Sequence, residues 1–246
     1  MKARLHIGTS GWHYKHWLGN FYPPKLPPAK MFEWYARHFR TVELNNSFYR
    51  LPTEDAFLHW RSQAPPGFTF AVKASRFITH MKKLKDPHSS VEKFFQRALL
   101  LNEKLGPVLF QLPPGWPVNL DRLEEFLAVL PSGLRYVFEF RDESWHSESV
   151  YRILRRHNAA LCVHDWRAAQ GPAVITADFT YVRMHGPSGA YHGSYSNFQL
   201  ENWASRIEGW GTSLAAIYLY FNNDQGGFAV RNAQTLQGFV GLRAAA

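Results

Sequence analysis

The chain has 246 residues, of which 46% are hydrophobic, and this combination excludes a disordered or fibrous chain and suits one folded domain. Lysine and arginine number 28 against 19 acidic residues, so this basic protein carries a formal net charge of +9, which favours anionic partners. A single cysteine, Cys162, excludes an intrachain disulfide, and no apolar run approaches the roughly 20 residues that span a bilayer, so we expect a cytoplasmic protein with no membrane partner and no disulfide-linked partner.

Eight β-like runs follow one another at intervals of about 30 residues, the size of a βα unit. In chain order they are Leu5–Ser10, Thr41–Ser47, Phe68–Ser75, Pro107–Leu112, Arg135–Arg141, Ala159–Asp165, Phe179–His185 and Ala216–Asn222. Between them, helical periodicity marks Phe32–Phe39, Val91–Leu99, Leu123–Leu130 and Ala229–Val240. Ser196 with Gln199 predicts a capping box at the start of another helix.

No linker or low-complexity segment divides this series of elements. The regular alternation of strand and helix predicts one parallel sheet. We therefore expect one domain over residues 1–246 with the α/β fold of a single (β/α)8 TIM barrel. A doubly wound open sheet is the alternative architecture.

The alternation of side chains within each strand predicts which residues face the helices and which face the barrel interior. Bulky apolar residues such as Phe138 and Val182 belong on the helix side. The opposite parity holds the polar residues Glu43, Asn45, Ser47, Lys73, Gln111, Glu139, Arg141, His164, Arg183, His185 and Asn222. Most of them lie toward the carboxyl end of a strand, where barrel enzymes place their sites. Because buried charge is costly unless paired, this set predicts a functional site.

The charged members of this set suggest roles by their chemistry. Glu43 and Glu139, on strands that lie across a barrel, are the candidate acid and base. Lys73, Arg141 and Arg183 exceed these carboxylates in number, so we expect them to hold an anionic substrate. A closed ion-pair network, with Glu43 beside Lys73, is the alternative. The candidates for orienting the ligand or stacking on it are Asn45, Gln111, His185, Asn222, Trp12 and Trp145.

Several of these features also have a purely structural interpretation. Trp12 and Trp145 are also suited to sealing the barrel top as apolar plugs. Glycine-rich segments follow the last two predicted strands, at 186–195 and 222–227, and such loops commonly bind phosphate through backbone N–H groups in this fold. The alternative is that these glycines only permit tight turns.

Metal and thiol chemistry are not favoured. Glu139, His164, Asp165 and His185 are metal-ligand types at strand ends, but interleaved arginine and lysine satisfy carboxylates and repel a cation. Cys162 lies within an apolar strand, where a free thiol is usually inert packing. The cofactor therefore stays unknown, and no metal ligand is assigned.

A set of motifs spread along the chain resembles one known family. They are Ile7-Gly8-Thr9-Ser10-Gly11-Trp12, Glu43-Leu44-Asn45-Asn46-Ser47-Phe48-Tyr49, Phe70-Ala71-Val72-Lys73, Phe110-Gln111-Leu112-Pro113, Phe138-Glu139-Phe140-Arg141 with Trp145, Val182-Arg183-Met184-His185-Gly186-Pro187 and Tyr220-Phe221-Asn222-Asn223-Asp224. Together they resemble the YecE-like family, also called domain of unknown function 72, through nearly the whole chain. The resemblance implies a (β/α)8 barrel in a cytosolic bacterial or archaeal protein, and it implies no established reaction.

Three hypotheses for function follow. The first is an enzyme, such as a hydrolase or lyase, that binds a phosphorylated or other anionic substrate at the barrel mouth and uses carboxylate acid–base chemistry. The second is a nucleic-acid-binding or nuclease-like protein with a basic rim formed by Arg50, Arg76, Lys82 and Lys83. The third is a non-catalytic metabolite sensor.

Overall fold

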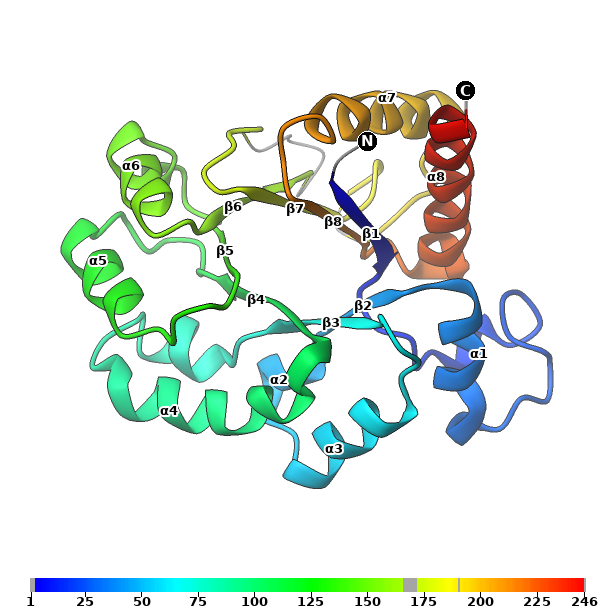
Figure 1. Cartoon of the computed structure of the whole chain (residues 1–246), viewed down its shortest axis with the longest axis horizontal. Coiled ribbons are helices and arrows are strands. Elements are labelled where there is room, and N and C mark those ends of the chain that lie inside the picture. Colours follow the sequence, from blue (N-terminus) through cyan, green and yellow to red (C-terminus); the bar gives the residue numbers. More distant parts are fainter. Residues whose placement is uncertain (1–2, 166–171, 190, 246) are drawn as a thin grey trace. The chain divides into compact units, whose positions relative to one another are not determined.

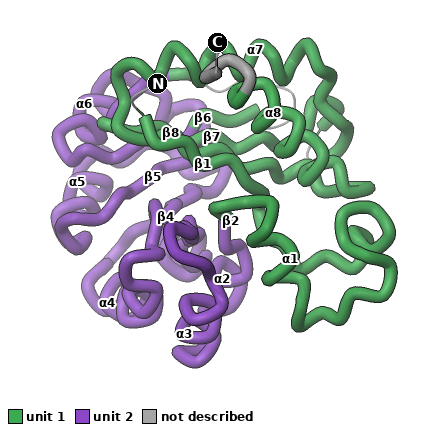
Figure 2. The backbone as a smooth tube through the Cα atoms, turned by 45° about the vertical axis from the view of Figure 1, so that its right-hand side comes forward, with its two compact units in different colours: residues 1–42, 163–173, 178–246 green, residues 43–162, 174–177 purple. Residues whose placement is uncertain are grey.

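The computed structural model describes residues 3–165, 172–189 and 191–245. The chain divides into two compact units, shown in green and purple in Figure 2. The first unit comprises residues 1–42, 163–173 and 178–246, and the second comprises residues 43–162 and 174–177. No helix in the described part of the chain is long and apolar enough to cross a membrane.

All eight predicted strands are present and parallel. They are β1 (Arg4–Thr9), β2 (Thr41–Leu44), β3 (Thr69–Lys73), β4 (Leu105–Gln111), β5 (Tyr136–Glu139), β6 (Ala160–His164), β7 (Phe179–Met184) and β8 (Ala216–Phe221). Their order in the sheet is β1-β8-β7-β6-β5-β4-β3-β2. From β2 to β8 each strand therefore lies beside its neighbour in sequence, and β8 pairs with β1, whereas a doubly wound sheet reverses its order at a switch point. This topology is that of a (β/α)8 barrel, which confirms the predicted fold class.

Helices alternate with these strands along the chain (Figure 1). The α-helices are α1 (Met31–His38), α2 (Asn46–Tyr49), α3 (Glu54–Gln63), α4 (Pro87–Ala98), α5 (Leu120–Ala128), α6 (Glu148–Arg156), α7 (Asn197–Trp210) and α8 (Phe228–Ala245). Shorter helical turns are η1 (Lys15–Trp17), η2 (Pro28–Lys30), η3 (Phe77–Met81), η4 (Leu99–Lys104), η5 (Glu143–Trp145) and η7 (Gln225–Gly227). The predicted capping box of α7 is confirmed, because the Ser196 hydroxyl accepts from the Gln199 backbone and the Gln199 side chain accepts from the Ser196 backbone.

The second unit shows why its strands have one apolar and one polar face. Phe110 of β4 and Phe138 of β5 both pack against Phe126 of α5, with ring centroids 4.9 and 6.2 Å apart. These residues occupy the parity predicted to face helices. Gln111 is in register with Glu139 at the ends of the same two strands, so both side chains lie on the opposite face.

The first unit has a corresponding face on β1, β7 and β8. Tyr181 is in register with Tyr218, and the Tyr218 ring stacks on His6 of β1 at 4.6 Å. Arg183 is in register with Tyr220 and is only 1% exposed. Buried tyrosines therefore share this face with a buried guanidinium, and the alternation predicted for β7 and β8 agrees with the register.

Most predicted strand boundaries are off by one or two residues, and the largest error is at β2. The run starting at Thr41 was expected to continue to Ser47, but β2 ends at Leu44 and a short helix follows. Asn46 and Ser47 favour turns and helix starts over strands, and the Asn46 side chain accepts from the Ser47 backbone at 3.0 Å. Asn45 thus precedes a helix and does not occupy an inward strand position.

Candidate functional site

Three basic side chains gather around one histidine in the second unit. We call Lys73, Arg76 and Arg141, together with His80 and Phe48, the cationic cluster. Lys73 ends β3 and is only 8% exposed. Its Nζ donates to Gln111 Oε1 at 2.7 Å and lies 4.0 Å from the centre of the Phe48 ring. Two residues predicted to bind substrate, Lys73 and Gln111, are thus in direct contact.

The position of Lys73 is fixed from both sides. The Ser47 hydroxyl donates to the Lys73 carbonyl at 2.6 Å, which ties the start of α2 to the end of β3. The ring of Phe48 on the same short helix lies under the ammonium group. A cation over an aromatic face is attracted to it, and burial strengthens this attraction. The early end of β2, missed in the strand prediction, is therefore what brings Phe48 to Lys73.

Glu139 and Arg141 form an ion pair with each other in the same unit. Their side chains are 0% and 5% exposed. Cys162 Sγ lies 3.9 Å from the other carboxylate oxygen of Glu139. Pairing with a guanidinium compensates the cost of burying this carboxylate. The geometry is consistent with the structural interpretation of the pair, and the acid–base role of Glu139 stays a prediction.

His80 was not singled out from the sequence. It lies on η3, a five-residue π-helix, and is half-buried. Its ring meets the Phe48 ring edge-on at 5.0 Å, and its Nδ1 is 2.9 Å from Thr79 Oγ1. Burial lowers the pKa of His80, and the charges of Lys73, Arg76 and Arg141 lower it further. The imidazole is therefore held in its neutral form at neutral pH.

The backbone that carries His80 is unusual. After the π-helix, Lys83, Leu84 and Asp86 all have left-handed conformations, with φ of 48°, 63° and 44°. Such conformations are costly for residues other than glycine, and both they and π-helices gather at functional sites. Leu84 is 1% exposed, so it anchors the segment in the core. This conformation could not be predicted, because the run around Lys83 has the composition of an ordinary basic surface.

A second polar group lies in the first unit, around Asp165 at the end of β6. The Asp165 carboxylate accepts from the backbone N–H of His185 at 2.5 Å and from the Tyr195 hydroxyl. That hydroxyl in turn accepts from the backbone N–H of Gly186 at 2.7 Å. Burial, followed by the charge of Asp165, raises the pKa of Tyr195, so the phenol stays protonated and remains a donor. His185 Nδ1 lies 3.2 Å from the Asn222 side-chain amide.

This group borders a pocket of about 440 Å³. Asp165, Gly186 and Tyr195 line it on one side, and residues of α7, including Trp203 and Arg206, line it on the other. The Arg206 guanidinium lies 5.2 Å from the centre of the Trp203 ring. The pocket thus combines one buried carboxylate with one cation and gives no surplus of positive charge.

The glycine-rich loop after β7 uses its amides internally. Besides Gly186, the backbone N–H of Tyr191 donates to the His185 carbonyl at 2.6 Å and that of His192 donates to Gly189 at 3.2 Å. Gly186 has φ of 118°, and a Cβ there would lie 2.3 Å from the His192 carbonyl oxygen. These facts favour the tight-turn interpretation of the glycines over a phosphate cradle. Ala190 of this loop lies outside the described residues.

The loop after β8 carries a carboxylate, Asp224, which does not suit an anion site. Asp224 accepts from Trp17 Nε1 at 2.6 Å and pairs with His16 at 2.8 Å. Burial raises the pKa of Asp224 to about 6. The backbone N–H of Gly227 donates to the Asp224 carbonyl. A carboxylate at this point repels a bound phosphate whenever it is ionised.

The remaining predicted site residues are buried. Glu43 of β2 is 0% exposed, and its catalytic role stays a prediction. Trp145 is fully buried, stacks on Phe140 at 4.9 Å and donates from Nε1 to the Trp116 carbonyl at 2.7 Å, which favours the plug interpretation. Trp12 is 9% exposed and contacts Phe32 at 5.1 Å. Within residues 3–165, 172–189 and 191–245, no three side chains of metal-binding type form a cluster that could hold an ion.

Comparison with known proteins shows to which family the chain belongs. A family model described as "Protein of unknown function DUF72" matches residues 6–246. The UPF0759 protein YunF of Bacillus subtilis is 28% identical over 94% of this chain and 93% of its own length. The UPF0759 protein YecE of Escherichia coli K12 is 33% identical over 74% of each chain.

Solved structures of DUF72 proteins have a fold similar to that of this chain. The crystal structure of a DUF72 family protein from Thermotoga maritima covers 97% of this chain and 99% of its own, with a TM-score of 0.88 at 28% identity. A DUF72 protein from Enterococcus faecalis is 17% identical, with a TM-score of 0.83 over 96% of this chain and 95% of its own, and supports the fold alone. The family model spans nearly the whole chain and a close structural match bears the same family name, so the chain belongs to the DUF72 family, together with the YecE and YunF proteins.

Proposed function

We propose that this protein binds a small anionic ligand, such as a phosphate ester, at the cationic cluster of the second unit. The observation that carries the proposal is that one ring, Phe48, contacts both the buried Lys73 ammonium and His80, an imidazole whose pKa the charges of Arg76 and Arg141 also lower. Even if Glu43 and Glu139 are both counted against them, three cations exceed two carboxylates. Two of these cations are buried and Arg76 is exposed beside them, and positive charge gathered at one place favours a bound anion.

The members of the cluster suit this role in different ways. Lys73 supplies a compact charge on a rigid strand end, with Gln111 and Phe48 fixing its position. Arg76 is exposed and presents a guanidinium at the rim, where it is able to chelate two oxygens of a phosphate. We further propose that the protein converts the bound anion by hydrolysis or elimination, with Glu43 and Glu139 as acid and base.

Phosphate or sulfate should stabilise the protein against heat at constant ionic strength. At ten times the dissociation constant, mass action adds about 1.4 kcal/mol, which for a chain of this size raises the melting temperature by roughly 3–6 °C. Arg76→Gln should remove most of this protection, because it takes away an exposed ligand-binding charge without disturbing the core. The measurement is a thermal unfolding series in sulfate and phosphate against chloride.

Lys85→Gln is the matched control, since Lys85 is an exposed cation of the same chain segment and does not act on His80. It should leave the protection intact. Equal melting temperatures in sulfate, phosphate and chloride would overturn the proposal.

A second candidate function, binding of single-stranded nucleic acid, is favoured by exposed aromatic and basic side chains near the cluster. Tyr49 is 73% exposed, Phe77 is 47% exposed, and the basic residues Arg50 and Arg76 next to them in sequence are also exposed. Large aromatic rings exposed beside cations are the usual platform on which bases stack while the phosphates are held. The ligand phosphate at the cluster would then belong to a nucleic-acid strand.

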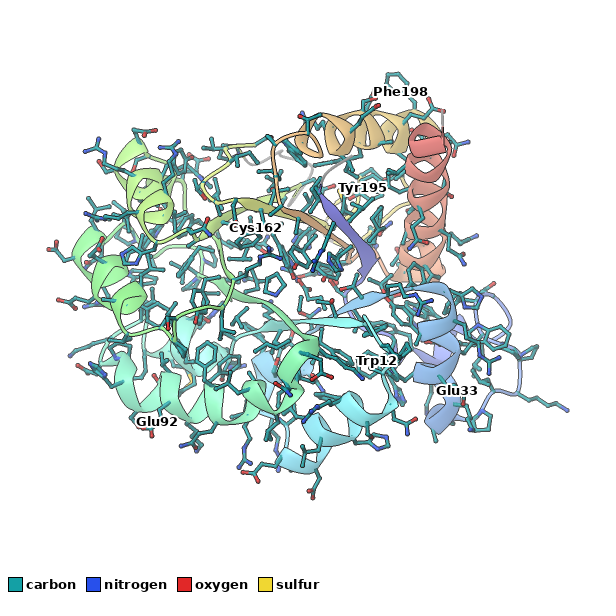
Figure 3. The ribbon with its side chains drawn as sticks, viewed as in Figure 1. Trp12, Glu33, Glu92, Cys162, Tyr195 and Phe198 are labelled. Atoms are coloured by element: carbon teal, nitrogen blue, oxygen red, sulfur yellow. The ribbon has the colours of Figure 1, made fainter. Side chains whose placement is uncertain are left out.

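Tyr49→Ser and Phe77→Ser should each weaken binding of a short single-stranded oligonucleotide about 5- to 160-fold, the range that loss of one stacked base implies. The salt dependence should stay the same, because neither change removes a charge. Phe198→Ser is the control, since Phe198 is an equally exposed ring on α7 of the first unit (Figure 3). Fluorescence anisotropy measures both quantities. Unchanged affinity in all three variants would show that scattered charges alone retain the oligonucleotide.

A further inference from the structure

We propose that His80 donates a hydrogen bond from Nε2 to the anion held by the cationic cluster and takes up a proton when that anion binds. The inference rests on the proposed anion site and adds to it a specific ligand contact and a proton linkage. It assigns a role to a residue that the sequence analysis did not identify.

The tautomer of His80 is the first step. Its Nδ1 is 2.9 Å from Thr79 Oγ1, whereas that hydroxyl lies 3.5 Å from the Ser75 carbonyl. A carbonyl oxygen only accepts, so the Thr79 hydroxyl donates to Ser75 and accepts from His80 Nδ1. The neutral imidazole then carries its proton on Nδ1 and a lone pair on Nε2. Nε2 is therefore the atom that takes up a proton, and the imidazolium is a donor there.

The surroundings of the ring place it close to Lys73. Phe48 contacts both groups, with the Lys73 ammonium 4.0 Å from its centre and the His80 ring edge-on at 5.0 Å. The charged groups that act on His80 are Lys73 at the end of β3, Arg76 on the same segment, and Arg141 just after β5. All three are positive, so an anion that they hold lies within the field that acts on the imidazole.

The strained backbone supports the same assignment. A π-helix inserts one extra residue per turn and so changes the direction of the side chains that follow. Here it carries His80, and the left-handed residues Lys83, Leu84 and Asp86 then return the chain to α4. Lys82 Nζ closes this return by donating to the Asp86 carbonyl at 2.9 Å. Strained backbone conformations are typical of functional sites, so we expect the half-buried histidine that this strained segment positions to have a function.

The electrostatic consequence has a definite sign. Without a ligand, burial and three neighbouring cations lower the pKa of His80. A bound dianion opposes these cations and favours the imidazolium, so it should raise the pKa of His80 by about one pH unit. By linkage, the anion then binds about tenfold more tightly below the pKa of His80 than well above it.

Sulfate is the probe of choice, because it remains a dianion across the pH range in which histidine titrates. Histidine-labelled protein is titrated by NMR between pH 5 and 8, with and without saturating sulfate at constant ionic strength, and His80→Gln assigns the His80 resonance. The expected result is a rise of about one pH unit for His80 and little change for His88, which is exposed on α4. His80→Gln retains an amide donor but no titrating group, so its dissociation constant for sulfate should become independent of pH.

The outcomes separate the two proposals. Sulfate binding that Arg76→Gln weakens would support the anion site. If, in the same experiments, sulfate does not change the pKa of His80 and its affinity for the unmodified protein is independent of pH, the His80 assignment is wrong and the anion site stands. If sulfate does not bind at any pH, both fall together.

Discussion

Replacing Arg141 with methionine should lower the free energy of unfolding by about 3–5 kcal/mol, because it leaves the Glu139 carboxylate buried without the guanidinium that now pairs with it. Both side chains are almost completely enclosed, at 5% and 0% exposure. Solvent therefore cannot replace the lost partner without opening the structure. Denaturant-induced unfolding of the two proteins gives this difference directly.

The same pair permits a double-mutant cycle. Glu139→Gln alone should also destabilise, since it leaves the Arg141 charge buried, whereas the double variant Glu139→Gln with Arg141→Met should recover a large part of the loss. Strictly additive effects would show that the two residues are not coupled. A neutral or stabilising Arg141→Met would contradict the view that this ion pair stabilises the fold.

The eight strands were predictable because each is short, apolar on one face and separated from the next by the length of one helix. The same alternation correctly placed Phe110 and Phe138 against α5 and put Gln111 and Glu139 on the other face. These are local patterns with period two, which backbone geometry alone dictates. The prediction that Lys73 and Gln111 both face inward rests on this same rule.

What could not be predicted depends on backbone conformations that the sequence does not mark. His80 sits in a segment with no helical period, where a π-helix and three left-handed residues decide its direction. Asn45 was misplaced because a strand pattern gave way to a short helix one residue later. Nor does a glycine-rich loop reveal whether its N–H groups face a ligand or its own carbonyls. In the loop after β7 they face carbonyls and the Tyr195 hydroxyl.

We expect the Tyr195 hydroxyl to contribute strongly to stability. Tyr195→Phe should lower the free energy of unfolding by about 2.5–6 kcal/mol, since one oxygen both donates to the Asp165 carboxylate and accepts from the Gly186 N–H. Loss of a hydrogen bond to a charged group costs about 1.5–3 kcal/mol, and a buried N–H left without an acceptor adds about 1–3 kcal/mol. Tyr49→Phe is the control, because the Tyr49 side chain is 73% exposed and its hydroxyl should contribute almost nothing.

Hydrogen exchange distinguishes a local from a global effect of Tyr195→Phe. The Gly186 amide should exchange much faster in the variant, since its acceptor is gone, while the His185 amide keeps its bond to Asp165 and should be less affected. Asp165→Asn should lower the free energy of unfolding less in the Tyr195→Phe variant than in the unmodified protein, because the two side chains share one hydrogen bond. A stability change below about 0.5 kcal/mol, the range of ordinary surface substitutions, would contradict the view that Tyr195 and Asp165 together fix the loop after β7.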